Sequence, residues 1–242
     1  QQEGRKIGIV NSDQHSKIEH ILLLNNKYLK KLEASEFEIA VVGLEKAGKS
    51  TFANALIENS VLPSAPERCT FTSTRLVYGH DDKAIVEFYT KKEFNHIFRS
   101  LLKEINYPKA ESESYETMSS QDFDLYFSQL SEINNNLFQL HSGKTDEEIR
   151  DILKYRNKLI LDEPVKEFAG EDLLSEEFQS YIKGHKIGDD TDTSKPRSVK
   201  RVEIQSSKLK KLTTAIVYDV PGFDSPTKIH ERQTIERLKS AD

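Results

Sequence analysis

Residues 37–50 read FEIAVVGLEKAGKS, and this stretch decides the fold. Its first six residues are mostly apolar and partly β-branched, the composition of a short strand buried in a parallel sheet. The last eight fit the pattern G-x-x-x-x-G-K-[ST], a glycine-rich turn whose backbone cradles phosphate groups. Residues 51–57 continue with helical spacing and no helix breaker. The order of strand, loop and helix therefore predicts a nucleotide-binding site.

Each part of the loop has its own task in this predicted site. Backbone N–H groups of the loop and the positive end of the helix dipole face the bound phosphates. Two glycines allow backbone conformations and close approaches that a Cβ would block. Lys49 is expected to reach the β- and γ-phosphates, and the hydroxyl of Ser50 to ligate Mg²⁺. The predicted nucleotide-binding residues of this stretch are Gly43, Glu45, Lys46, Ala47, Gly48, Lys49, Ser50 and Thr51.

Length, charge and cysteine content narrow the class of protein. The 242 residues suffice for one large domain, or for a domain with a smaller sub-domain. Charged residues make up 31% of the chain and the net charge is −5, so nothing in the composition points to a nucleic-acid partner. The single Cys69 excludes an intramolecular disulfide framework and fits a reducing, cytoplasmic location. No apolar run approaches 18 residues, so no membrane-spanning segment is predicted.

The chain is expected to have four segments. Residues 1–35 form a leading helix, and residues 36–90 hold the loop, a proline-containing segment and a β-hairpin. Residues 91–198 show recurring helical patterns with linker-like stretches between them, which indicates a helical insertion. Residues 199–242 resume the sheet. The predicted fold class is α/β of the P-loop type, a mostly parallel sheet flanked by helices.

Two of the expected helices carry start signals. The leading helix should begin at a cap formed by Ser12 or Asp13 and run to about Leu32, with a broad apolar face. That face either packs on its own domain or belongs in a bundle with segments outside the chain. In the insertion, residues 145–148 (TDEE) predict a capped helix start.

Residues 61–70 contain two prolines and lie where nucleotide-dependent switches place a mobile segment over the γ-phosphate. Thr70, Thr72 and Thr74 alternate from there toward the next strand, and some of them are simply strand threonines. One of the three could complete the coordination of Mg²⁺. Spacing alone does not choose among them.

A second motif, DVPG at residues 219–222, follows the apolar strand 213–218. A D-x-x-G match has little weight by itself, but this one stands at the carboxyl end of a buried strand, where open α/β sheets bind ligands. There Asp219 can hold the water shell of Mg²⁺, and the N–H of Gly222 can sense the γ-phosphate.

The tetrad [NT]-K-x-D, which reads guanine, does not occur in residues 1–242. We therefore expect the base-reading half of the fold to lie outside this sequence. The chain would then be one piece of a longer polypeptide, or would be completed by another chain.

Three stretches together resemble the large GTPase domain of the dynamin superfamily, especially that of bacterial dynamin-like proteins. They are residues 41–57, Val61-Leu62-Pro63 with a threonine seven residues after the proline, and residues 219–223 (DVPGF). In that family the threonine after Leu-Pro is the switch threonine, which selects Thr70. The resemblance covers residues 37–90 and 199–242.

This resemblance implies an activity and partners. The activity is hydrolysis of GTP to GDP and phosphate with Mg²⁺, coupled to self-assembly and membrane remodelling. The partners are a guanine nucleotide, a second copy bound through the G domain, and a membrane contacted peripherally. The resemblance also implies that the leading helix belongs to a helical bundle or neck. Two alternatives stay open: a slow nucleotide-dependent switch, and an ATP-using relative.

The loop departs from the family pattern at two positions. Many dynamins carry Gln and Ser where this chain has Glu45 and Lys46. Guanylate-binding proteins and atlastins place a cis-acting arginine at the Lys46 position. We therefore hypothesise that Lys46 supplies positive charge near the β/γ bridge in the transition state. The predicted catalytic residues are Lys46, Lys49 and Thr70, and the predicted metal ligands are Ser50, Thr70 and Asp219.

Overall fold

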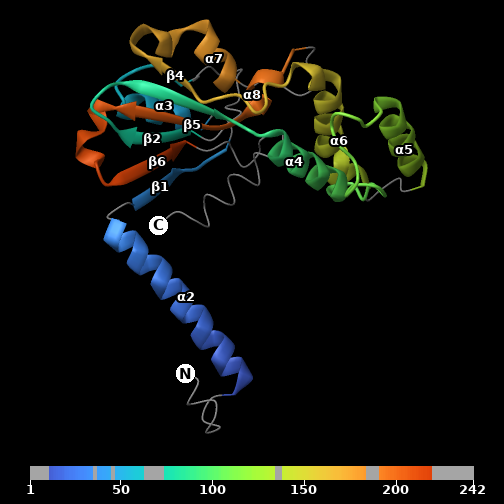
Figure 1. Ribbon diagram of the computed structural model, residues 1–242, viewed down its shortest axis with the longest axis horizontal. Helices are drawn as coiled ribbons and strands as arrows, with labels where there is room; N and C mark the ends of the chain where they lie inside the picture. Colours follow the sequence, from blue (N-terminus) through green and yellow to red (C-terminus); the bar gives the residue numbers. More distant parts are fainter. Residues whose placement is uncertain are drawn as a thin grey trace. The chain divides into compact units, whose positions relative to one another are not determined.

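The fold is seen in a computed structural model of the chain (Figure 1). The chain forms two compact units, residues 1–37 and residues 38–242. Among the described helices, none is long and apolar enough to cross a membrane. The structure describes residues 11–34, 37–44, 47–62, 74–133, 138–183 and 191–219.

Helix α2 (Ser12–Ala34) is the leading helix. Its cap is Asn11, and the predicted cap at Ser12 or Asp13 is wrong. The N–H of Gln14 donates to Oδ1 of Asn11 at 2.8 Å, and the N–H of Asn11 donates to Oε1 of Gln14 at 3.0 Å. This reciprocal pair is a capping box, with Gln in the place of the more familiar Glu. Several apolar side chains of the helix are exposed, among them Ile21, Leu23 and Leu29.

In the described ranges, six strands form one sheet in the order β1-β6-β2-β5-β3-β4. Among the pairs whose registers are described, β2 with β5 is parallel, whereas β2 with β6, β3 with β5 and β3 with β4 are antiparallel. The α/β class is confirmed, and the sheet is mixed, with more antiparallel pairing than a mostly parallel sheet implies. The strands are β1 (Phe37–Val41), β2 (Thr74–Tyr78), β3 (Lys83–Phe88), β4 (Lys166–Ala169), β5 (Val199–Ser206) and β6 (Ala215–Asp219).

Strands β2 and β3 do not form the predicted hairpin, because β5 lies between them. The apolar side chains of Val202 and Ile204 in β5 are buried by this central position. The turn from β2 to β3 passes close to β5 and requires a glycine there. A Cβ on Gly79 would lie 2.8 Å from the Cβ of Gln205 in β5. Local sequence signals described both strands correctly. The strand that separates them follows more than a hundred residues later and could not be placed from those signals.

The segment 91–198 contains helices, as expected, but also strand β4, which the sequence analysis missed. Strand β4 has four residues and a single buried side chain, Phe168, so it has too little periodicity to be recognised. It pairs with β3 at the edge of the sheet. The helices of the segment are α4 (Lys91–Glu104), α5 (Ser120–Ile133), α6 (Phe138–Tyr155), α7 (Glu176–Ile182) and α8 (Ser194–Ser198), with 3-10 helices η1 (Arg156–Lys158) and η2 (Gly170–Leu174).

The buried side chains form two main cores. One lies on the face of the sheet that is covered by α3 (Lys49–Leu56) and α7, and it includes Ile57, Ile204 and Phe178. The other lies among α4, α5 and α6 and includes Phe98 and Ile152. Figure 1 shows these three helices grouped beside the sheet. The predicted cap at residues 145–148 is wrong, because α6 runs through it and Thr145 donates to Glu104 of α4 instead.

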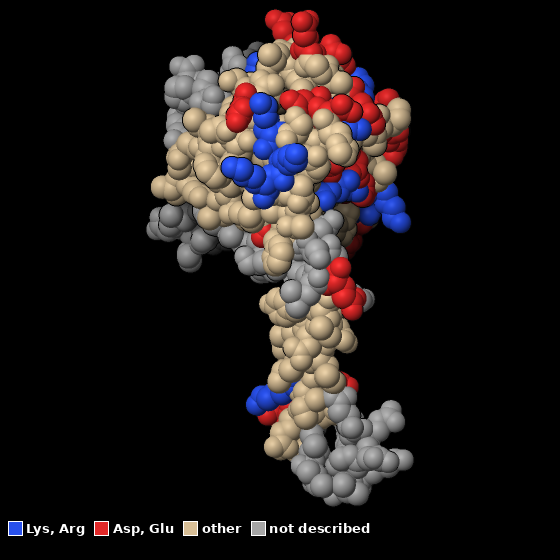
Figure 2. Space-filling view, turned by 90° about the vertical axis from the view of Figure 1, so that its left-hand side faces the viewer, with Lys and Arg blue, Asp and Glu red and all other residues tan. Residues whose placement is uncertain are grey.

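Figure 2 shows a group of basic side chains near the middle of the face it presents, with acidic side chains above it and to its right, so this face is not continuously basic. The 3-10 helix η3 (Ser207–Leu212), the orange-red turn at the left of Figure 1, carries three lysines. One of them, Lys208, pairs with Glu58 at 2.9 Å. That the protein has no nucleic-acid partner stays a prediction.

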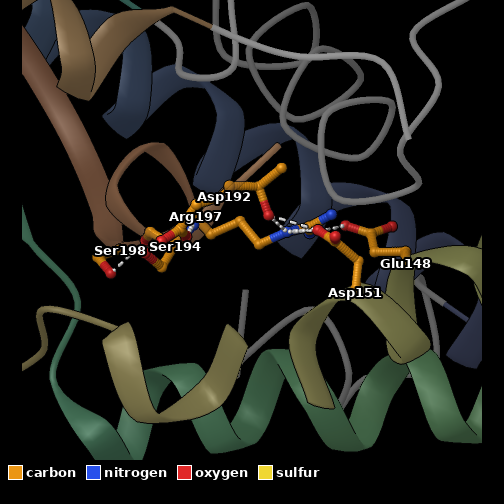
Figure 3. A network of polar contacts seen from close by, with 7 residues as sticks. Glu148, Asp151, Asp192, Ser194, Arg197 and Ser198 are labelled. Carbon is orange, nitrogen blue, oxygen red and sulfur yellow. Dashed lines mark hydrogen bonds and ion pairs between the residues drawn. The ribbon is translucent and has the colours of Figure 1, made fainter. Parts of the chain in front are cut away.

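A buried ionic contact joins the two cores (Figure 3). Arg197 of α8 donates from Nη1 to Glu148 at 3.1 Å and from Nε to Asp151 at 2.8 Å, both on α6. The side chains of Arg197 and Glu148 are 2% and 0% exposed. The next residue, Ser198, accepts a hydrogen bond from the N–H of Ile160 at 2.8 Å. Because β5 begins directly after α8, this contact fixes the α4–α6 core to the centre of the sheet.

Replacing Arg197 with Met is expected to lower the free energy of unfolding by about 3–5 kcal/mol, because the buried carboxylate of Glu148 would lose the guanidinium charge that compensates it. Lys158→Met is the matched control, since Lys158 pairs with Asp192 at 3.0 Å but is 63% exposed. Its loss should stay within about 1 kcal/mol. Chemical denaturation followed by circular dichroism measures both. Equal losses would show that the buried contact is no more important than a surface pair.

Candidate functional site

The loop after β1 has the backbone geometry that its glycines predict. Gly48 has φ 84° and ψ 14°, a left-handed conformation that side chains rarely adopt. A Cβ on Gly43 would lie 3.3 Å from the Cβ of Ala47, which is tighter than ordinary packing. The N–H of Phe52 donates to the carbonyl of Gly48 at 2.9 Å and begins the hydrogen-bond ladder of α3. The loop therefore turns tightly and delivers the chain directly into a helix.

Lys49, the first residue of α3, folds back over the start of the loop. Its Nζ donates to the carbonyl of Leu44 at 2.7 Å and to that of Gly43 at 3.3 Å. An ammonium group has three donors, so these two carbonyls do not use all of them. The positive charge is thus held at the N-terminal end of α3, where the helix dipole also favours an anion.

The phosphate loop and the end of β6 meet through one hydrogen bond. The hydroxyl of Ser50 donates to Oδ2 of Asp219 at 2.8 Å, although 169 residues separate the two. Asp219 is fully buried. The structure therefore brings the phosphate loop together with Asp219, the first residue of the DVPG motif, at the carboxyl end of β6.

The carboxyl group of Asp219 is held in an unfavourable environment. Burial raises the pKa of Asp219 to about 6, although the hydrogen bond from Ser50 and the charge of Lys49 act in the opposite direction. Its second oxygen, Oδ1, is buried and has no hydrogen-bond partner among the described residues. Buried polar atoms are nearly always paired, so an orphaned carboxylate oxygen at this position calls for a positively charged ligand.

Thr74 lies beside Asp219 in the sheet. In the antiparallel pair of β2 and β6 it is the direct partner of Asp219. Its side chain is fully buried, and within the part of the chain that the structure describes its Oγ1 has no hydrogen-bond partner. Two orphaned oxygen atoms therefore sit on neighbouring strands. The sequence analysis named Thr74 only as one of three alternating threonines, because strand register is not readable from spacing.

The remaining predicted residues are placed as follows. Thr51 is exposed on the first turn of α3. Asn54 lies one turn after Ser50 and was missed by the sequence analysis; a polar residue among the apolar positions of α3 was its only signal. Four predicted site residues lie outside the described ranges, namely Glu45, Lys46, Thr70 and Gly222.

Two bacterial proteins are similar to this chain over short stretches. A protein named dynamin-like protein 1, from Campylobacter jejuni subsp. jejuni serotype O:23/36 (strain 81-176), is 38% identical over 74 residues, which are 31% of this chain and 10% of that protein. A bacterial dynamin-like protein from Nostoc punctiforme (strain ATCC 29133 / PCC 73102) is 35% identical over 95 residues, or 39% of this chain and 14% of that protein. The matched stretches thus span a small part of either relative.

A solved structure, described as an oligomerised bacterial dynamin pair that senses and tethers membranes over long range, also aligns with the chain. Its TM-score is 0.44 at 17% identity, and the alignment covers 98% of this chain and 25% of that chain. The sequence model of the dynamin family matches residues 39–242. That match includes the phosphate loop, strand β6 and everything between them. The chain belongs to the dynamin family, and residues 39–242 are part of its G domain.

Proposed function

We propose that this chain is part of a dynamin-like GTPase that hydrolyses GTP to GDP and phosphate with Mg²⁺. The observation that carries the proposal is the hydrogen bond between Ser50 and Asp219 at 2.8 Å. It joins a phosphate-binding loop to the strand end at which a nucleotide-dependent switch keeps its acidic residue.

Transfer of a phosphoryl group to water depends on positioning and on neutralising charge, with little covalent chemistry for the protein. In our proposal the loop N–H groups orient the phosphates, and the ammonium of Lys49 neutralises their charge. Thr70 orients the attacking water through its backbone, and the N–H of Gly222 senses the γ-phosphate. Glu45, Ala47 and Thr51 complete the surface around the nucleotide.

The described part of the site fits Mg²⁺. This ion prefers hard oxygen ligands, and the hydroxyl of Ser50 and the carboxylate of Asp219 supply them side by side. The orphaned Oδ1 of Asp219 is the kind of atom that a cation, or its water shell, would satisfy. Bound there, Mg²⁺ would neutralise charge on the phosphate oxygens. We propose Ser50, Thr70 and Asp219 as its protein ligands or water-shell contacts.

We further propose that the chain acts as a homodimer or larger oligomer through its G domain and contacts membranes peripherally. Family membership supports both statements. The four segments of the chain, residues 1–35, 36–90, 91–198 and 199–242, keep their proposed roles as leading helix, first sheet segment, insertion and second sheet segment. Strand β4 makes the insertion part of the sheet as well.

Lys49→Ala is expected to weaken binding of Mg²⁺ with GTP or GDP by at least about 30-fold, the factor for losing a charge-assisted contact of about 2 kcal/mol. The exposed Lys92 on α4 offers a matched control, and Lys92→Ala should bind as the unchanged protein does. Calorimetry on the longest available polypeptide, with ATP and ADP as comparison ligands, measures this. Preference for adenine nucleotides would select the ATP-using alternative. Binding without measurable turnover at any protein concentration would select the slow switch.

Asp219→Asn is expected to stabilise the nucleotide-free protein at pH 7.5, because it removes a charge that burial disfavours. A pKa that rises from 3.8 to about 6 corresponds to a penalty on the order of 3 kcal/mol for the ionised group. The folded protein takes up the proton first as the pH falls through 6, so the unchanged protein recovers stability. The difference should therefore vanish below about pH 4.

Denaturation of both proteins between pH 7.5 and pH 4 measures that difference. An Asn variant that is less stable at pH 7.5, or a difference independent of pH, would contradict the assigned environment of Asp219. The same variant should lose its Mg²⁺-dependent affinity for nucleotide at pH 7.5, since an amide cannot replace the carboxylate.

Lys46→Ala is expected to lower kcat at least about tenfold while leaving affinity for GDP unchanged, if Lys46 acts on the transition state only. Turnover should be measured across protein concentrations, because the charge could be needed only in the dimer. A variant that hydrolyses GTP at the unchanged rate at every concentration would exclude this role for Lys46.

A further inference from the structure

Two residues of the segment that follows α3, Val61 and Leu62, are buried, which is unusual outside helices and strands. After α3, Glu58 adopts a left-handed conformation with φ 51°, and the chain turns back on itself. Val61 and Leu62 then enter the core on the sheet face, at 1% and 2% exposure. Because peptide groups in such a place need hydrogen-bond partners, the neighbouring side chains must supply them.

Asn54 supplies hydrogen-bond partners for both backbone groups of Leu62. Its Nδ2 donates to the carbonyl of Leu62 at 2.8 Å, and its Oδ1 accepts from the N–H of Leu62 at 2.8 Å. Both bonds are buried, and only a carboxamide can donate and accept in this way. Asn54 therefore holds Leu62 as a neighbouring strand would, fixing both its position and its orientation.

Gln179 makes a hydrogen bond to the backbone of Val61, the residue before Leu62. Its Nε2 donates to the carbonyl of Val61 at 2.7 Å. Gln179 belongs to α7, which is capped by Ser175 and anchored in the same core by Phe178. The chain at Val61 and Leu62 is thus held between the phosphate-loop helix and a helix of the insertion.

Asn54 and Leu62 are both connected along the chain to residues of the proposed nucleotide site. Asn54 lies four residues after Ser50, so the two side chains are on the same side of α3. Leu62 is followed in the sequence by Pro63 and, eight residues after Leu62, by Thr70. A shift of Leu62 would change the point from which the Thr70 segment starts.

We propose that Asn54 and Gln179 are positioning residues for the nucleotide reaction, and that Gln179 couples the insertion to it. This inference rests on the proposed function. Neither side chain touches the nucleotide. They act through Val61 and Leu62, which we call the clamped pair. A nucleoside diphosphate depends on the loop around Gly48 and Lys49, whereas the γ-phosphate also depends on Thr70. Loss of the clamp should therefore affect triphosphate binding and turnover more than diphosphate binding.

The test compares Asn54→Ala and Gln179→Met with the matched control Asn95→Ala in the longest available polypeptide. Asn95 also satisfies a backbone group, accepting from the N–H of Tyr115 at 3.2 Å, but within the α4–α6 core. Gln179 is only half-buried, so Gln179→Met should fold even where Asn54→Ala does not. The ligands are GDP and a slowly hydrolysed GTP analogue with Mg²⁺, and kcat and KM for GTP are measured alongside.

For Asn54→Ala we expect GDP affinity within about twofold of the unchanged protein, and analogue affinity and kcat lower by about tenfold. Gln179→Met should shift the same ratio in the same direction by about threefold. Hydrogen exchange at Val61 and Leu62 should be faster in both. Asn95→Ala should change stability without changing the ratio of GDP to analogue affinity.

Three results would overturn the inference. In the first, both clamp variants keep the unchanged ratio and kcat. In the second, they lose GDP and analogue affinity equally, which is the sign of a general structural defect. In the third, Asn95→Ala alters the ratio as they do. An unchanged protein that binds no guanine nucleotide would overturn the proposed function itself, and the inference with it.

Discussion

The hydrogen bond between Ser50 and Asp219 is the contact on which the arrangement of the site depends. It requires the first turn of α3 to lie against the carboxyl end of β6, so the strand order around β6 cannot vary freely. As far as the described residues go, it also leaves one oxygen of a buried carboxylate without a hydrogen-bond partner. An unpaired carboxylate oxygen is costly to bury, and in the proposed function it contacts a cation or its water shell. Under the proposed function, the site is therefore organised for a ligand at the expense of the stability of the free protein.

The segment between the two motif halves is part of the same structure. Strand β4 extends the sheet, α7 covers one of its faces, and Arg197 attaches the α4–α6 core to the start of β5. A replacement of this segment by a short loop would remove a sheet strand and part of the main core. Its helices thus pack on the sheet and, through α7, on the segment that follows α3.

Contacts from the insertion and from α3 meet at the peptide groups of Val61 and Leu62. The clamped pair receives hydrogen bonds from α3 and from α7, and both helices pack in one core. Protein cores are close-packed, so a shift of one helix is passed on to its neighbour. Asn54 and Gln179 provide a physical route of this kind, from the insertion to the helix that carries Lys49 and Ser50.

The sequence by itself determined the α/β class, the phosphate loop with its two glycines, and strand β6 with its terminal Asp219. Each of these depends on residues that are adjacent in the chain, and local periodicity or a special backbone conformation is visible there. The tertiary structure alone decided that β5 separates β2 from β3, that β4 exists, and that Thr145 serves a helix contact. It alone also placed Thr74 opposite Asp219 and Asn54 against Leu62. These features depend on register and on contacts between distant segments, which leave no periodic signal in the chain.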